Sequence, residues 1–265
     1  MSGLIHHWPL GESLDDIVSG KNITLKINGQ IGANRFNEPY SALKLNEGYG
    51  EFPPGKYFEP SGYTFMIWVL ASGLKNHQRI FEFGNGHDND NVGIGYHGGE
   101  TTSVIQFKSG NYSCSHQNMI ELNKWIHYAV SVGQSSSYFY VNGVEINSCP
   151  NFPTNLRSIE RSKNFIGGTA WSHNTYSFFN GKLDDLKIFN RQLSAQETVE
   201  EKDKTGSKVY GHLLHIFISL KLFTEGLVHY WPMAGSTNDL IGSKHMTIVK
   251  GYLTTDKFGN KKSGM

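Results

Sequence analysis

The sequence has little charge of either sign and no long apolar run. Its 24 basic and 23 acidic residues leave a formal net charge of +1 over 265 residues, so no electrostatic field favours nucleic acid, and we predict no nucleic-acid partner. A membrane helix needs roughly 18 to 20 consecutive apolar residues. The most apolar stretch, residues 209–223, is shorter and carries two histidines and a lysine. We therefore predict no membrane insertion within this segment.

Cysteine and the common catalytic motifs are also scarce. The two cysteines, Cys114 and Cys149, each lie near the end of a predicted strand. They can form a disulfide only if those strand ends are neighbours, and two buried free thiols are the alternative. The sequence contains no HExxH metalloprotease motif, no G-x-S-x-G nucleophile elbow and no P-loop. These absences exclude three large classes of enzyme motif.

What the sequence does have is glycine, aromatic residues and turn signals, with 30 Gly and 13% aromatic residues. Residues 138–146 read as two short strands around Asn-Gly, a strong hairpin signal. Trp68 and Trp125 alternate with apolar neighbours, and we assign both to the core. Ser194 and Glu197 have the spacing of a capping box before a short helix. An all-β sandwich or barrel is therefore the predicted fold class.

A charged strand precedes that helix, within residues 179–197. Strand alternation places Asp184 on one face with Leu186 and Ile188, in phase with the core. A buried carboxylate is costly unless it is hydrogen-bonded, paired or bound to a metal ion. Asp184 is therefore expected either to tie its strand to a neighbour or to help hold a cation.

The same run, FNGKLDDLKIFNRQLSAQE, resembles the closing strand and short helix of laminin G-like domains in the concanavalin A-like lectin/glucanase superfamily. The resemblance covers roughly residues 3–200, and it implies a two-sheet antiparallel β-sandwich of jelly-roll type with a short helix after the last strand. The other segments that carry it, in family order, are YTFMIWV (63–69), RIFEFGNG (79–86), NKWIHYAVSV (123–132), YFYVNGVEI (138–146) and FIGGTAWS (165–172).

An internal repeat shapes the domain prediction. Residues 3–26 align without gaps to residues 226–249, with nine of 24 positions identical. About 40 residues cannot complete a sandwich that takes nearly 200 in the first copy. We predict a laminin G-like module at 1–203, a linker with a helical pattern at 204–225 and the incomplete start of a second copy at 226–265.

Catalysis is predicted to be absent. Glucanases built on this sandwich carry paired acids at alternating positions of one strand, because a retaining mechanism needs carboxyl groups about 5 to 5.5 Å apart. No such run is present: Glu82 stands alone between two phenylalanines, and Asp184 and Asp185 are adjacent and point to opposite faces. We therefore predict a protein that is not an enzyme.

Calcium is the predicted cofactor. Hard cations take oxygen ligands from carboxylates, amides and backbone carbonyls, which favours the Asp/Asn/Gly-rich loop at 14–22. The resemblance implies that this loop lies beside the last strand, with Asp16, Gly20 and Asn22 facing Asp184. The alternative is that Asp16 caps a turn and Asp184 hydrogen-bonds to backbone.

Two loops supply candidate ligand-binding residues. One is the acidic loop at 84–91, which otherwise reads as a solvated hairpin tip. The other combines aromatic and planar polar groups of the kind that contact sugars, although its tryptophan could instead be packed. The candidates are Asp88, Asp90, Trp171, His173, Asn174 and Tyr176.

Together these features predict a non-catalytic recognition module. It would bind carbohydrate or extracellular protein through loops at one rim, with calcium ordering them. The alternative is a structural spacer in a multidomain extracellular array. An extracellular or cell-surface location follows mainly from the resemblance.

Overall fold

The computed structural model describes residues 3–75, 77–87, 89–97, 104–109, 112–149, 158–171 and 178–204. The chain divides into two compact units, Met1–Thr205 and Gly206–Met265. All described residues belong to the first unit. The predicted linker and second copy lie outside the described residues.

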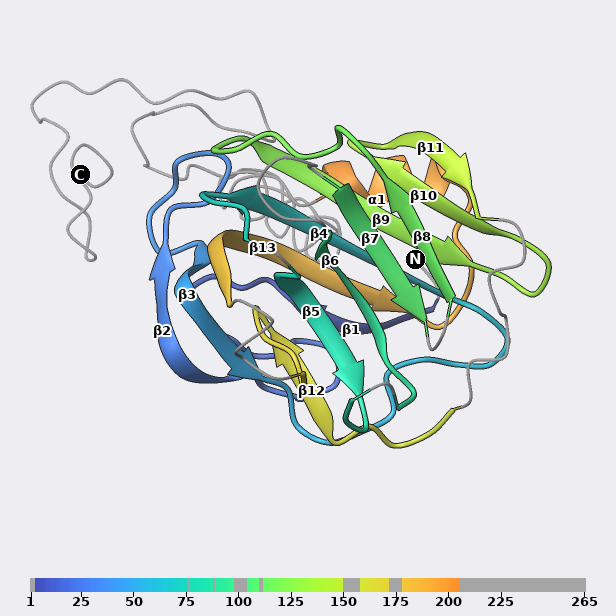
Figure 1. Ribbon diagram of the computed structural model, residues 1–265, viewed down its shortest axis with the longest axis horizontal. Helices are drawn as coiled ribbons and strands as arrows, with labels where there is room; N and C mark the ends of the chain where they lie inside the picture. Colours follow the sequence, from blue (N-terminus) through green and yellow to red (C-terminus); the bar gives the residue numbers. More distant parts are fainter. Residues whose placement is uncertain are drawn as a thin grey trace, which may run out of the picture. The chain divides into compact units, whose positions relative to one another are not determined.

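Strands make up most of the described chain, and a single α-helix, α1 (Ala195–Lys204), follows the last of them (Figure 1). In the described part of the chain the strands are β1 (Leu4–Trp8), β2 (Thr24–Gly32), β3 (Ala42–Glu51), β4 (Tyr63–Ala71), β5 (Arg79–Gly84), β6 (Val92–His97), β7 (Val104–Ser109), β8 (Tyr112–His116), β9 (Trp125–Val132), β10 (Ser137–Val141), β11 (Val144–Ser148), β12 (Lys163–Ile166) and β13 (Phe179–Phe189).

All strand pairs are antiparallel, and they form one long sheet that curls back on itself. The strand order is β11-β10-β9-β4-β13-β3-β12-β5-β6-β7-β8, with β1 paired to β13 and β2 to β3. Figure 1 shows β5, β6 and β7 in front of β4 and β13. The two halves of the sheet therefore form the layers of a sandwich, which confirms the predicted fold class.

The core lies between these layers and is rich in aromatic side chains. Phe65 of β4 meets Phe81 of β5 edge to face, with ring centroids 4.8 Å apart, an arrangement that aromatic pairs favour. Trp8 of β1 is fully buried and packs edge to face against Phe52, at 4.9 Å. Side chains from both layers therefore fill one continuous core.

Both short-range sequence signals are confirmed. Val141 pairs with Val144 across the hairpin, and Asn142 and Gly143 both have positive φ, of 53° and 84°, as a type I′ turn requires. In the capping box, the Glu197 backbone N–H donates to Ser194 Oγ over 3.3 Å, and Ser194 N–H donates to Glu197 Oε2 over 2.9 Å. Local chemistry thus fixes these two features.

The predicted side-chain phase of β13 is wrong at one point. A bulge interrupts the pairing of β13 with β4 between Asp184 and Lys187, and Asp185 takes a positive φ of 58°. The extra residue keeps Leu183 and Leu186 both in the core. Asp184, next to Leu183, therefore faces away from the core and does not share a face with Leu186.

The prediction that Trp68 and Trp125 belong to the core is also wrong. Both are half-buried. They alternate with Ile67 and Ile126, which do lie in the core cluster, so the tryptophans stand on the outer face of β4 and β9. Their apolar neighbours in sequence include residues of both faces, which misled the assignment.

Candidate functional site

The loop at 14–22 is organised around the buried carboxylate of Asp16. Its Oδ1 accepts backbone N–H bonds from His7 at 2.9 Å, Val18 at 3.0 Å and Ser19 at 3.2 Å. Its Oδ2 bonds to His6 Nδ1 at 2.6 Å and to the Ser19 hydroxyl. Burial alone would raise the pKa of Asp16, but these hydrogen bonds together hold it well below its ordinary value. Asp16 therefore caps a turn and ties it to β1.

The other two residues predicted with Asp16 belong to the same turn. Gly20 has a φ of +74° and its N–H donates to the Asp16 carbonyl over 2.9 Å. Asn22 Oδ1 accepts the Asp16 N–H over 3.2 Å. Both residues help to shape the loop around Asp16.

Asp184 has a partner that the sequence did not suggest. Its carboxylate forms a buried ion pair with Arg35 Nη1, and the Arg35 guanidinium lies 4.6 Å from the centre of the Trp68 ring. Burial and the nearby Asp185 raise the pKa of Asp184 to about 7, with Arg35 acting in the opposite direction. Asp184 therefore joins β13 to the segment after β2.

Calcium at Asp16 and Asp184 stays a prediction, and these contacts do not fit an ion as they stand. Asp16 already accepts from protein donors at both oxygens, and Asp184 already faces a guanidinium. An ion would have to displace these partners, and calcium takes six to eight oxygens.

A thermal melt in excess calcium and again in chelator tests the ion. A cation that binds only the folded chain raises Tm, by mass action. Because both carboxylates are already paired, we expect the two melts to coincide. A higher Tm in calcium, lost in the Asp16→Asn variant but kept in Asp15→Asn, would instead place the ion at Asp16.

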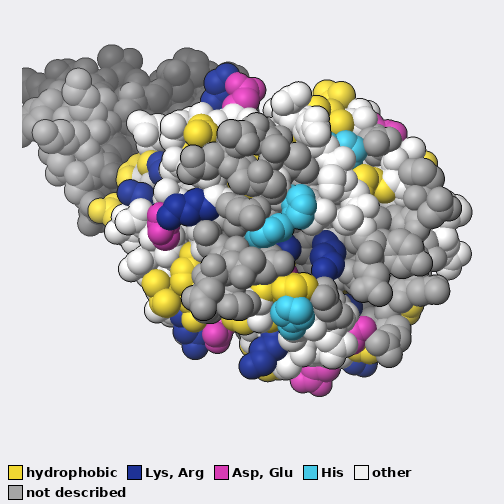
Figure 2. Space-filling model, viewed as in Figure 1, with side chains coloured by type: hydrophobic (Ala, Val, Ile, Leu, Met, Phe, Trp, Pro, Cys, Tyr) yellow, Lys and Arg dark blue, Asp and Glu magenta, His cyan; other side chains and the backbone are white. Residues whose placement is uncertain are grey.

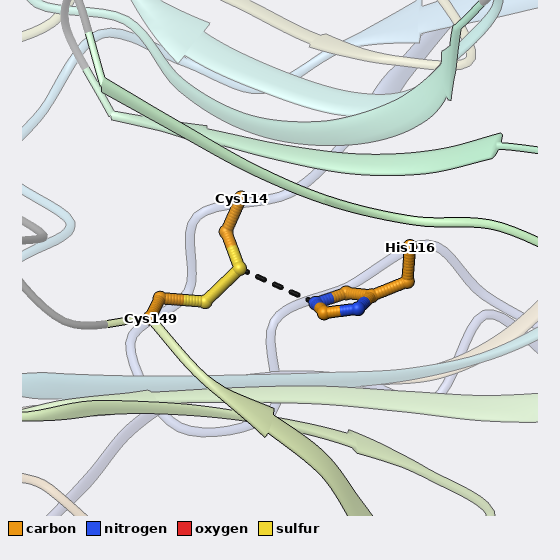
Figure 3. Close-up of side chains that lie close together, drawn as sticks. All are labelled: Cys114, His116 and Cys149. Carbon is orange, nitrogen blue, oxygen red and sulfur yellow. Dashed lines mark hydrogen bonds between the residues drawn. A yellow bond between two sulfur atoms is a disulfide. The ribbon is translucent and has the colours of Figure 1, made fainter.

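The two cysteines form a disulfide, which decides between the alternatives left by the sequence. Cys114 lies in β8 and Cys149 follows β11, with Cα atoms 6.0 Å apart. Figure 3 shows the His116 imidazole beside the bridge, with Nε2 3.3 Å from Cys114 Sγ. Among the described residues, this is the one group of three His, Cys, Asp or Glu side chains close enough to share a metal ion. The disulfide withholds both thiolates from such a role.

A row of side chains crosses the outer face of the sheet from β2 to β8. On β5, Phe81 and Phe83 point into the core, so Glu82 between them points outward. Residues paired directly across neighbouring strands share a face of the sheet, so the chain of residue pairs that includes Glu82 lies on this outer face. The row consists of Thr24, Glu51, Phe165, Glu82, Gly93, Lys108 and Ser113. The row is mixed polar and aromatic, and its two central residues, Glu82 and Gly93, are buried.

Trp171 is held over this row by the buried Glu82 carboxylate. Glu82 Oε1 accepts from the Thr169 hydroxyl at 2.8 Å and from Ala170 N–H at 3.1 Å, and Arg79 Nε donates to Oε2 at 3.3 Å. The half-buried Trp171 follows directly, with Lys108 Nζ 5.0 Å from the centre of its ring. This is a fixed, amphipathic aromatic surface beside charged groups.

Figure 2 views the molecule from the side of β5, β6 and β7, and it shows His, Lys and Arg side chains gathered near the middle of this face. The rings of His77 and His97 lie 4.6 Å apart, at the β6 end that is opposite the β5–β6 turn. His87 lies against the Trp171 indole. His87 and Lys108 therefore lie next to Trp171, while the His77–His97 pair lies toward the other end of β6.

The other predicted ligand residues can be placed only in part. Asp90 lies in the turn between β5 and β6, where its carbonyl accepts from Arg161 Nε over 3.0 Å, and its backbone has a positive φ of 58°. Asp88, His173, Asn174 and Tyr176 lie outside the described residues. Among the predicted ligand residues that the structure describes, Trp171 is the one that lies beside the row.

A cavity of about 260 Å³ opens at the β2 end of the row. It lies where β2 begins and β3 ends, beside the part of β12 that continues past Glu51. The strand part of its lining is Thr24 and Lys26 of β2, Glu51 of β3, and Lys163, Asn164 and Phe165 of β12.

The sequence model of the concanavalin A-like lectin/glucanases superfamily, of laminin G type, matches residues 45–198. The chain belongs to this superfamily. No curated protein matches the sequence.

Solved structures share the concanavalin A-like fold at low sequence identity. Domain 4 of AbnA, an extracellular arabinanase from Geobacillus stearothermophilus solved with arabinotriose, is 21% identical with a TM-score of 0.57, covering 75% of this chain and 98% of that one. The botulinum neurotoxin serotype D ligand-binding domain, solved with N-acetylneuraminic acid, is 14% identical with a TM-score of 0.56, covering 77% and 51%. The binding domain of Paraclostridial Mosquitocidal Protein 1 is 19% identical with a TM-score of 0.55, covering 75% and 51%.

Within this concanavalin A-like frame, Glu82 serves as an anchor for the Trp171 segment. Both of its carboxylate oxygens accept hydrogen bonds from protein groups. In the described part of the chain, no helix is long and apolar enough to cross a membrane.

Proposed function

We propose that this chain is a non-catalytic carbohydrate-binding module that holds a sugar against Trp171 on the outer face of β5, β6 and β7. The observation that carries the proposal is the anchoring of Trp171 by Glu82 beside Lys108. An indole offers a flat apolar face to the C–H side of a sugar ring, while neighbouring polar groups bond its hydroxyls.

The comparisons support the ligand class. Two solved structures of the same fold, the arabinanase domain and the serotype D domain, were determined with sugars bound. Glu82 is engaged by protein donors and has no partner acid on its own strand, which argues against a glycosidase acid pair. The disulfide suits an oxidising compartment, so we place the module outside the cell or on its surface.

Replacement of Trp171 by alanine tests the proposal. We expect the affinity for arabinotriose or sialyllactose, whichever the parent chain binds, to fall about tenfold or more, because the stacking surface is lost. Titration calorimetry measures the affinity, and Trp171→Phe should keep part of it. The matched control is Tyr40→Ala, since Tyr40 is 67% exposed and lies away from the row.

Equal affinity of the Trp171→Ala variant and the parent would move the site elsewhere. A structural spacer is the second candidate function. It becomes the better account if the parent chain binds neither sugar nor any member of a glycan panel.

A further inference from the structure

The cavity at the β2 end of the row has the chemistry of a separate site for a charged ligand. Its lining includes an ion pair between Lys26 Nζ and Glu51 Oε2, 3.1 Å apart. Lys163, on the opposite wall, is exposed and makes no ion pair with any described residue. Lys26 therefore neutralises Glu51, and among the described residues the positive charge of Lys163 has no carboxylate partner.

Uncharged hydrogen-bonding groups are open in the same cavity. Asn22 uses its Oδ1 to accept the Asp16 N–H, which turns its amide NH₂ toward other partners. Neither this NH₂ nor the Thr24 hydroxyl bonds to any part of the chain that the structure describes. The amide NH₂ and the Lys163 ammonium are donors only, so these open groups favour a ligand with acceptor oxygens.

Apolar surface completes the lining. Phe165 is half-buried in β12, and Pro53 and Pro54 close the end of the cavity. The volume of about 260 Å³ is below the range of about 300 to 1,000 Å³ typical of drug-sized ligands. The cavity therefore suits one small ring.

We propose that this cavity is a subsite for one acidic monosaccharide unit. The sugar carboxylate pairs with Lys163, its hydroxyls bond to Asn22 and Thr24, and its ring lies against Phe165. The sugar class rests on the proposed function, but the site and its charge preference are separate from Trp171.

The strand registers link the two sites. Phe165 pairs with Glu82, and from there the row passes through Gly93 to Lys108. Three strand spacings of about 4.8 Å separate β12 from β7, roughly 14 Å in all. An acidic oligosaccharide laid across the strands can therefore reach the cavity and Trp171 together.

Glucuronate and glucose are matched probes, since they differ only by a carboxylate in place of a hydroxymethyl group. With the full chain, we expect glucuronate to bind about three- to fivefold more tightly than glucose, as one exposed charge pair allows. Shifts of backbone amide signals in NMR titrations measure both affinities and locate the binding. Raising the salt from about 0.05 M to about 1 M should reduce the preference, because the pair is exposed.

Lys163→Ala should abolish the preference for glucuronate, while Lys124→Ala should keep it, since Lys124 has a 67% exposed side chain in the turn before β9. Glu51→Gln should increase the preference, because it removes the one carboxylate in the lining. If the chain binds glucuronate and glucose equally, or if Lys163→Ala leaves the preference intact, the proposal is wrong.

The two proposals fail in different ways. If Trp171→Ala loses affinity for the oligosaccharide and the cavity shows no preference for glucuronate, only the proposed site at Trp171 is supported. A Lys163-dependent preference supports the subsite, and the Trp171 site is excluded only if Trp171→Ala binds the oligosaccharide as tightly as the parent chain.

Discussion

Joint replacement of Cys114 and Cys149 by serine is expected to lower the free energy of unfolding by about 4 kcal/mol. Chain-entropy arguments give this size for a bridge that closes a loop of this length, the cysteines being 35 residues apart. The topology adds a reason specific to this fold. β11 and β8 are the two ends of the strand order, so the bridge fastens one open edge of the curled sheet to the other.

Urea unfolding with and without a dithiol reductant measures the effect. The parent chain should lose stability in reductant and approach the double-serine variant, which should not respond to reductant. Amide hydrogen exchange should rise first in β8 and β11, because these edge strands open locally before the core does. An unchanged urea midpoint on reduction would show that the edges are held without the bridge.

Features decided by neighbours in sequence could be predicted. The Asn142-Gly143 turn and the Ser194/Glu197 capping box depend on residues within three positions of each other, and both were found as predicted. The fold class also followed, because short alternating strands with frequent turns have few other solutions. At this level, pattern and structure agree.

Features decided by distant segments could not be predicted. The ion pair of Asp184 joins residues 149 apart, and no local pattern points to Arg35. The bulge at Asp185 adds one residue to β13, which a strict alternation of period two cannot anticipate. The row that carries Phe165 and Glu82 depends on strand registers that are set by the whole sheet. The arrangement of the site therefore depends on the three-dimensional fold, although Trp171 itself was a sequence candidate.

Asp16→Asn is expected to cost about 3 kcal/mol, because it converts a buried anion that accepts from five donors into a neutral amide. One amide oxygen cannot accept all of these bonds, and the new NH₂ group would meet donors. His6, which bonds to Asp16, also stacks on Trp8 with ring centroids 5.2 Å apart. The loss should therefore reach the core through β1. Asp15→Asn, a change of the same charge at an exposed neighbour, is the control and should be nearly neutral.

The pH dependence gives this prediction its sign. The pKa of Asp16 is lower in the folded chain than in the unfolded one, so the unfolded chain binds the proton more readily. The stabilisation is complete above the ordinary aspartate pKa of about 4 and is lost as the pH falls below it. Urea midpoints between about pH 3 and pH 7 should thus fall more steeply toward acid in the parent chain than in Asp16→Asn, while Asp15→Asn should follow the parent. Parallel curves for all three chains would mean that the Asp16 carboxylate is not the anchor of the N-terminal strand. A steeper fall in the parent chain would instead confirm the anchor formed by His6, Trp8 and Asp16. The sequence repeats these three residue types at the aligned positions His229, Trp231 and Asp239.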